Sequence, residues 1–327
     1  MNLLENALAR VGFRAAERAW PPRRLSLALQ GGGSFGAFTW GVLDRLLEEP
    51  DIAFDAVSGS SAGAVNAVLL ASGLADGGRA EAKARLERFW RRMSAAAAFL
   101  PSASLAAGLG LVMRAMSPYQ LNPFNLNPLR EALAAEVDFA RLRAASPLRL
   151  LIAATRVRDG KLRIFTEDEA SVDAVLASAC LPLIHHTVEI DGEPYWDGGY
   201  VANPPLLPLV QASRTEHLLM VQVTPTTSDR LPTAPREIAK RLEQIQFNAP
   251  LNAELEALKT AMIVGATPKL RRLHIGRISA QEEFEGLADE SAGDLGRAFL
   301  ERLRISGRRA VEGWLEEATR EGRPAAA

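Results

Sequence analysis

A serine lies midway between two glycines near the start of the chain, with Gly59 two residues before Ser61 and Gly63 two residues after it. Because glycine adopts backbone conformations that other residues avoid, this spacing permits a sharp strand-to-helix turn that exposes the serine hydroxyl. The short run 56–58 is mostly apolar, and small and aliphatic residues fill 62–70. The pattern predicts a buried strand and then a buried helix, with Ser61 as a nucleophile between them.

A second glycine-rich segment follows the predicted strand 25–30. It contains Gly31, Gly32 and Gly33, and Gly36 comes three residues later. Without Cβ atoms, several backbone N–H groups at a helix N-terminus can point at one small anion. A serine nucleophile needs such a site for the oxyanion that forms during acyl transfer, so the two segments are complementary.

The same glycines also fit a dinucleotide-binding fingerprint, which has glycines at the positions of Gly31, Gly33 and Gly36. That fingerprint requires an acidic residue at the end of the next strand, about 20 residues further on. Asp51 and Asp55 lie before or at the start of that strand instead. A Rossmann-type nucleotide-binding oxidoreductase therefore remains an alternative.

A carboxylate on a glycine turn supplies a third segment. Asp197 precedes Gly198 and Gly199, downstream of a predicted short strand over 188–190. Taken alone, this tripeptide is typical of an ordinary β-turn.

Together the three segments resemble the patatin-like phospholipase family, lipid acyl hydrolases that carry them in this order. The resemblance spans roughly Leu25 to Pro208 and implies a three-layer α/β/α sandwich with a mainly parallel central sheet. It implies that Ser61 is the nucleophile, that Asp197 is the only other member of a catalytic dyad, and that the Gly31 to Gly33 amides form the oxyanion hole. The glycines that would shape the elbow and the turns are Gly36, Gly59, Gly63, Gly198 and Gly199. One departure is Phe35, which occupies a position where the family often has a basic residue.

An aspartate is a weak base at its reference pKa of about 3.9, so a Ser-Asp dyad needs partial desolvation of the carboxylate. Tyr195 and Trp196 directly precede Asp197 and are candidates for that role. A histidine is not required by the resemblance, although His185 and His186 between the two dyad residues leave a triad open.

The two remaining histidines, His217 and His274, lie in or at the start of predicted strands and are interpreted as structural.

Composition favours one large α/β enzyme domain. The 327 residues carry 48% hydrophobic and 24% charged residues with a formal charge of −1, which gives no electrostatic reason to expect nucleic acid. We expect a catalytic domain over 25–327, with the motifs in 25–210 and a C-terminal scaffold in 211–327. The single cysteine, Cys180, cannot form an internal disulfide and favours a reducing, cytoplasmic location.

Two segments are candidates for contact with a membrane surface. The N-terminal segment 1–24 combines apolar residues at helical spacing with arginines, and no signal peptide or spanning helix is predicted. The segment 93–129 has a single charged residue, Arg114, and is interrupted by prolines and glycines, so we expect an apolar insertion near the site. A lid, an acyl pocket and an oligomer interface all remain open for this insertion.

The expected function is hydrolysis of a carboxylic ester in a phospholipid or related lipid, without a metal or cofactor. The partner is the lipid substrate, and a homo-oligomer is left open. A lipid-binding protein on the same scaffold without catalysis is a second alternative.

Overall fold

The computed structural model describes residues 21–97, 116–228, 231–265, 267–281 and 292–321. Most of the predicted N-terminal segment 1–24 and the part 98–115 of the predicted insertion lie outside these residues. In the described part of the chain, no helix combines the length and apolarity needed to cross a bilayer.

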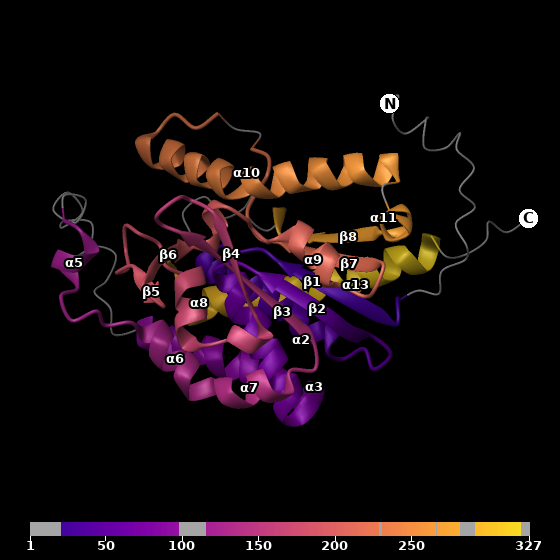
Figure 1. The fold of residues 1–327 in the computed structure, drawn as a ribbon, viewed down its shortest axis with the longest axis horizontal. Helices are drawn as coiled ribbons and strands as arrows, with labels where there is room; N and C mark the ends of the chain where they lie inside the picture. The colour runs from indigo at the N-terminus through magenta and orange to yellow at the C-terminus, as the bar shows by residue number, and fades with distance from the viewer. Residues whose placement is uncertain (1–20, 98–115, 229–230, 266, 282–291, 322–327) are drawn as a thin grey trace, which may run out of the picture.

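Eight strands form one mixed sheet (Figure 1). They are β1 (Arg24–Leu29), β2 (Ala53–Gly59), β3 (Arg149–Arg156), β4 (Leu162–Thr166), β5 (Val188–Ile190), β6 (Glu193–Asp197), β7 (His217–Gln222) and β8 (His274–Ser279). Strands β3, β2, β1, β7 and β8 are parallel neighbours in that order. Strands β4 and β6 pair antiparallel with β3, and β5 pairs antiparallel with β6.

Along the chain, helices alternate with these strands. The α-helices are α2 (Gly36–Leu46), α3 (Ala62–Ala97, interrupted at Gly77 and Gly78), α5 (Pro118–Leu121), α6 (Pro128–Glu136), α7 (Phe139–Ala145), α8 (Val172–Ser178), α9 (Leu206–Ala212), α10 (Pro235–Val264), α11 (Pro268–Arg272) and α13 (Arg297–Glu321). Three short 3-10 turns are η1 (Gly33–Phe35), η2 (Glu167–Glu169) and η3 (Gly198–Tyr200).

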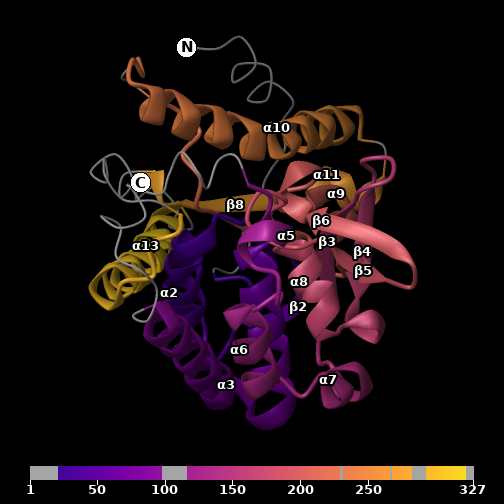
Figure 2. The same cartoon turned by 90° about the vertical axis from the view of Figure 1, so that its left-hand side faces the viewer.

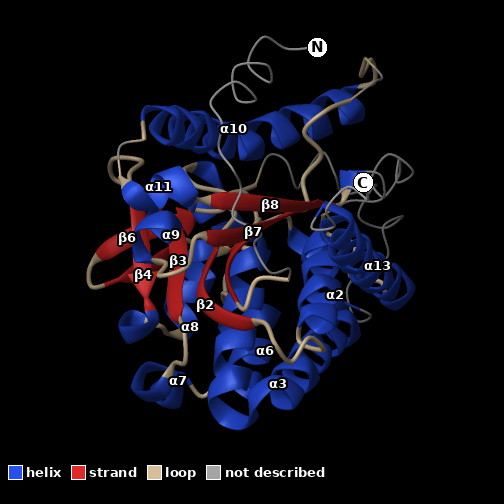
Figure 3. Ribbon diagram, turned by 90° about the vertical axis from the view of Figure 1, so that its right-hand side faces the viewer, coloured by secondary structure: helices blue, strands red, loops and turns tan. Residues whose placement is uncertain are grey.

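The sheet is covered on both faces (Figure 3). Alternate residues of a strand point to opposite faces, and β1 illustrates the consequence. Leu27 and Leu29 join a buried core with α2, α3 and α13, whereas Ala28 joins a second core with α9 and α10. The predicted three-layer α/β/α sandwich with a mainly parallel sheet is therefore confirmed.

Predicted strands are present at the expected places. The strand expected over 188–190 is β5, and the strand expected over 25–30 is β1, shifted by one residue. His217 and His274 each begin a strand, β7 and β8, and their rings lie 5.9 Å apart. Their structural interpretation agrees with this placement at the amino ends of parallel strands, the edge opposite Ser61.

Strand pairing around β3 brings the two candidate catalytic segments together. Residues 151 and 152 of β3 pair with both β2 and β4, so these two strands take opposite edges of β3. Residues 154 and 155 pair with both β4 and β6, so β6 lies on the same edge as β2. Asp197 is opposite Ala154, two residues beyond the position where Ile152 faces Gly59. The end of β6 therefore lies just beyond the end of β2, along the same edge of β3.

The outer helix α13 packs closely against α2 through glycines. A Cβ atom on Gly307 would overlap the carbonyl oxygen of Phe38, and one on Gly41 would overlap the carbonyl oxygen of Arg304. Backbone atoms on the opposite helix cannot move aside as a flexible side chain can, so this crossing requires glycine at both positions.

We expect Gly307→Ala to lower the free energy of unfolding by about 1–3 kcal/mol, because the added methyl group overpacks the contact with α2. Gly313→Ala on the same helix is the matched control, since a Cβ there meets no atom within 4 Å. The control should raise stability by about 0.5–1 kcal/mol through helix propensity. Urea unfolding of both variants checks this, and equal effects would contradict the packing argument.

Candidate active site

Ser61 occupies a strained turn between β2 and α3. Its φ of 53° lies in the left-handed region that non-glycine residues rarely adopt. A Cβ on Gly63 would overlap the carbonyl oxygen of Leu29, and one on Gly59 would overlap the backbone of Gly63. Both glycines are thus required by close backbone approach, and the turn has the strained strand-to-helix geometry of a nucleophile elbow.

Hydrogen bonds hold the elbow from both sides. The backbone N–H of Ser61 lies 3.1 Å from the carbonyl oxygen and 3.0 Å from the Oγ of Ser178, the last residue of α8. The hydroxyl of Ser60 donates to the carbonyl oxygen of Ala202. Ser178 was not predicted from sequence, because 117 residues separate it from Ser61.

The glycine-rich segment lies directly beside the elbow. A Cβ on Gly31 would lie 2.6 Å from the Ser60 carbonyl oxygen and 2.8 Å from Ser61 Cβ. The segment leads from β1 through η1 into α2, as predicted, and Gly33 has a φ of 59°. Gly36 is also needed here, because its Cβ would lie 2.7 Å from that of Ala62.

One of the three amides expected in an oxyanion hole already donates a hydrogen bond within the protein. The N–H of Gly31 donates to the side-chain oxygen of the buried Asn203 at 2.7 Å. Of the three glycine amides, those of Gly32 and Gly33 have no acceptor among the described residues. Asn203, which sequence reasoning missed, anchors the loop through Gly31.

Asp197 ends β6 with its side chain fully buried. Its Oδ1 accepts from the N–H of Gly199 at 2.7 Å, and its own N–H donates to the carbonyl oxygen of Cys180 at 2.8 Å. Its Oδ2 is buried with no well-formed hydrogen bond among the described residues. Burial raises the pKa of Asp197 to about 7, while the Gly199 N–H and the Ser61 hydroxyl act in the opposite direction. The two candidate dyad residues are therefore neighbours.

The surroundings of Asp197 differ in part from the expectation. Trp196 faces away from the carboxylate because adjacent strand residues alternate, and its indole N–H donates to Thr187 Oγ1 at 3.0 Å. Phe247 of α10 contributes instead, since its ring would contact a Cβ on Gly199 at 2.5 Å and lies 5.2 Å from the Tyr200 ring. The sequence alone gives no signal for this contact.

Gly198 and Gly199 shape the turn that follows the carboxylate. A Cβ on Gly198 would overlap the carbonyl oxygen of Ala153 in β3, so the turn lies flat against the sheet. This close approach and the hydrogen bond from Gly199 fix the orientation of the carboxylate.

Residues 27–210 match the family model described as patatin-like phospholipase. The chain belongs to this family. The match covers the glycine-rich loop, the elbow and the Asp-Gly-Gly turn of this patatin-like domain, and it favours the hydrolase interpretation over the dinucleotide alternative.

No curated protein matches the chain. Similar solved structures include VipD from Legionella pneumophila, with 17% identity, a TM-score of 0.46, and coverage of 90% of this chain and 66% of VipD. The type III effector protein ExoU matches with 18% identity, a TM-score of 0.37, and coverage of 91% of this chain and 54% of ExoU. The chain thus spans less than two thirds of the length of either protein.

The histidines that left a triad open have other contacts in this patatin-like domain. His185 Nδ1 accepts from the N–H of Leu181 at 3.3 Å, and burial lowers the pKa of its ring. The His186 ring lies 4.2 Å from the Tyr119 ring, with its Nε2 3.2 Å from the carbonyl oxygen of Pro118. Within the described residues, the Asp197 carboxylate interacts with the Gly199 N–H and the Ser61 hydroxyl, and not with an imidazole.

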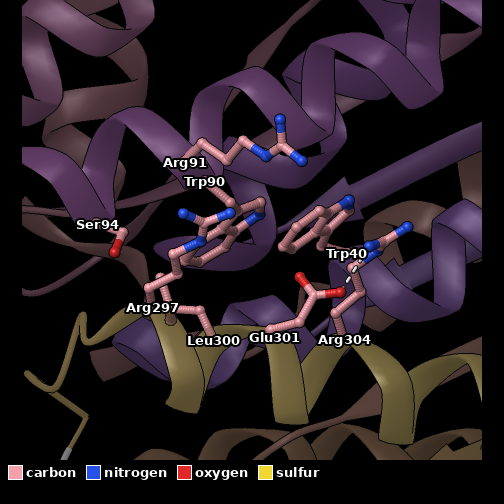
Figure 4. Close-up of a pocket in the computed structure, with 8 residues that line it drawn as sticks. All are labelled: Trp40, Trp90, Arg91, Ser94, Arg297, Leu300, Glu301 and Arg304. Atoms are coloured by element: carbon pink, nitrogen blue, oxygen red, sulfur yellow. Dashed lines mark hydrogen bonds and ion pairs between the residues drawn. The ribbon is translucent and has the colours of Figure 1, made fainter.

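A cleft of about 170 Å³ lies elsewhere, between α2, α3 and α13 (Figure 4). The nearly parallel rings of Trp40 and Trp90 line it, with centroids 6.5 Å apart, and Ser61 and Asp197 are not among its lining residues. Trp90 nevertheless supports the site, because its indole N–H donates to Asn66, whose amide donates to the carbonyl oxygen of Gly36.

The raised pKa of Asp197 predicts a pH-dependent cost to folding. The unfolded carboxyl ionises near its reference pKa, whereas the folded one ionises near 7, so stability falls as pH rises between these values. Asp197→Asn keeps the acceptor for Gly199 and removes the charge. We expect the variant to exceed the wild type in free energy of unfolding by up to about 4 kcal/mol at about pH 8, with almost no difference at about pH 4.

Urea unfolding at both pH values measures this difference. A gap of the same size at both values would show that the carboxyl titrates normally, and would contradict the argument from burial.

Proposed function

We propose that this chain is a serine acyl hydrolase that cleaves carboxylic esters of lipids through a Ser61–Asp197 dyad. The observation that carries the proposal is a buried carboxylate, with a pKa raised to about 7, beside a serine on a strained turn. A base that titrates near neutral pH suits removal of a serine proton much better than an ordinary aspartate does. The family to which the chain belongs supports a lipid substrate.

In the first half of the reaction, Ser61 Oγ attacks the ester carbonyl carbon while Asp197 accepts its proton. The carbonyl oxygen becomes an oxyanion, and we assign its stabilisation to the N–H groups of Gly32 and Gly33, which have no acceptor among the described residues. The carbon–oxygen bond to the leaving alcohol then breaks, and Asp197 returns the proton to that alcohol. The acyl group remains as an ester on Ser61.

In the second half, Asp197 accepts a proton from water, which attacks the acyl carbonyl carbon. The same two amides stabilise the second oxyanion, and Ser61 leaves with the proton from Asp197, so the products are a carboxylic acid and the free enzyme. In contrast to the expectation of three donors, Gly31 is assigned to loop anchoring, because its N–H already donates to Asn203.

We further propose that the substrate is a phospholipid or lysophospholipid. This step rests on the family alone, since head-group choice depends on side chains outside the dyad.

Labelling by a fluorophosphonate probe tests the dyad. We expect wild type to be labelled, Ser61→Ala to show no labelling, and Asp197→Asn to react about 10² to 10⁴ times more slowly because its general base is lost. Circular dichroism first establishes that all three proteins fold. Labelling that persists in Ser61→Ala would refute the assignment.

The pH profile tests the role of the carboxylate separately. Because only the ionised form of Asp197 accepts a proton, kcat/KM for a soluble ester should rise with pH and level off above about 7. Asp197→Asn should lose this acid limb along with most of its activity. A limb near the reference pKa of about 4 would contradict the proposed desolvation.

A further inference from the structure

Two described segments without a single Asp, Glu, Lys or Arg lie on the surface near the site. They are 116–129, which contains α5, and 174–188, which begins inside α8 and continues beyond its end. Large apolar side chains in these segments are 40% to 86% exposed, namely Tyr119, Leu121, Phe124, Leu126, Leu183 and Ile184. We call these six residues the apolar tips. Exposure of this many large apolar side chains marks a contact surface on a water-soluble domain.

The two segments form one surface. The rings of Tyr119 and His186 are in contact, tilted by 36°, and the Thr187 N–H donates a hydrogen bond of 3.2 Å to the Tyr119 hydroxyl. His186 Nε2 also lies 3.2 Å from the carbonyl oxygen of Pro118. Figure 1 shows α5 standing out from the layered body, beyond β5 and α8, and in Figure 2, seen from that side, α5 lies in front of the body.

This surface is directly connected to the dyad. Cys180, at the base of the second segment, accepts the backbone N–H of Asp197 and donates its Sγ hydrogen to the carbonyl oxygen of His186. Ser178, in the same segment, holds the backbone N–H of Ser61. Only a few residues therefore separate the exposed Leu183 from the groups that position the nucleophile and the base.

Several backbone groups in each of the two segments are hydrogen-bonded within the same segment. The amide side chain of Asn122 accepts from the N–H of Leu126 and donates to its carbonyl oxygen, both at 2.9 Å. In segment 174–188, the carbonyl oxygen of Leu181 accepts from the N–H groups of Ile184 and His185. A loop that enters an apolar medium needs such internal pairing, because the medium offers no hydrogen-bond partners.

We propose that the apolar tips are the surface through which this protein docks on a lipid layer, next to the site that would cleave one of its esters. The identity of the partner rests on the proposed function, whereas the surface rests on exposure, lack of charge and internally paired backbone. These projecting segments have no charged side chains, as insertion of Phe124 and Leu126 among lipid chains requires.

Sedimentation with sucrose-loaded phosphatidylcholine vesicles tests the proposal, in a Ser61→Ala background that prevents turnover. We expect Phe124→Ser combined with Leu126→Ser to weaken vesicle partition about 10- to 100-fold, since two large apolar side chains no longer leave water. Partition of the background protein should persist at high salt, because the surface carries no charge.

The matched control combines Ile263→Ser with Val264→Ser. These residues are 67% and 72% exposed at the end of α10 near α11, far from α5 in Figure 1, and their replacement should leave partition unchanged. Equal loss in both double variants, or no loss in either, would overturn the proposal. A dimer in light scattering that the tip variant alone converts to monomer, with partition unchanged, would assign the surface to a second copy of the chain instead.

Because vesicle partition is measured without turnover, its result is separate from the labelling experiment. Labelling of Ser61 together with tip-independent partition would retain the proposed hydrolase and refute this docking surface.

Discussion

The site depends on one close contact between two backbones. The carbonyl oxygen of Leu29 lies against the α-carbon of Gly63. No Cβ fits between them, so α3 begins directly against the end of β1. This approach leaves Ser61 with a φ of 53°, a conformation that costs on the order of 1–3 kcal/mol unless the surrounding structure enforces it. It also brings the glycine-rich loop, which continues from β1, into contact with Ser61.

The second costly feature, a buried carboxylate, depends on the same edge of the sheet. The pairing of β2 with β3 ends at Gly59, and β6 then pairs with the same edge of β3. The candidate segments around Ser61 and Asp197 therefore both lie beside β3. Thr155 of β3 donates to the carbonyl oxygen of Asp197 at 2.7 Å, and Gly199 donates to its side chain. These bonds fix the carboxylate but satisfy only one of its oxygens well, and a base with an unsatisfied oxygen is suited to accept a proton.

The sequence was sufficient to predict the turns whose shape depends on local backbone geometry. Glycines on either side of Ser61 and after Asp197 are required by turns that span a few residues, so their spacing is visible without a structure. Asn203 and Phe247 were missed because each acts through tertiary contacts, across 172 residues to Gly31 and from α10 to Gly199. The hydrogen bond from Gly31 to Asn203 is the reason why the proposal has two oxyanion donors and not three.

The glycine-rich loop has few side chains of its own, so its position must be set by others. Gln30, just before it, accepts from the N–H groups of Val223 and Thr224 at 2.8 Å and donates to Asn248 of α10 at 3.0 Å. Asn203 holds the other side of the loop and donates to the backbone of α10. Because breaking buried amide bonds is costly, this network holds the free N–H groups in place before substrate arrives. Stabilisation of an oxyanion requires donors that do not reorganise during the reaction. In the proposed hydrolase, α10 therefore serves the site by fixing this loop, although it contributes no reacting group.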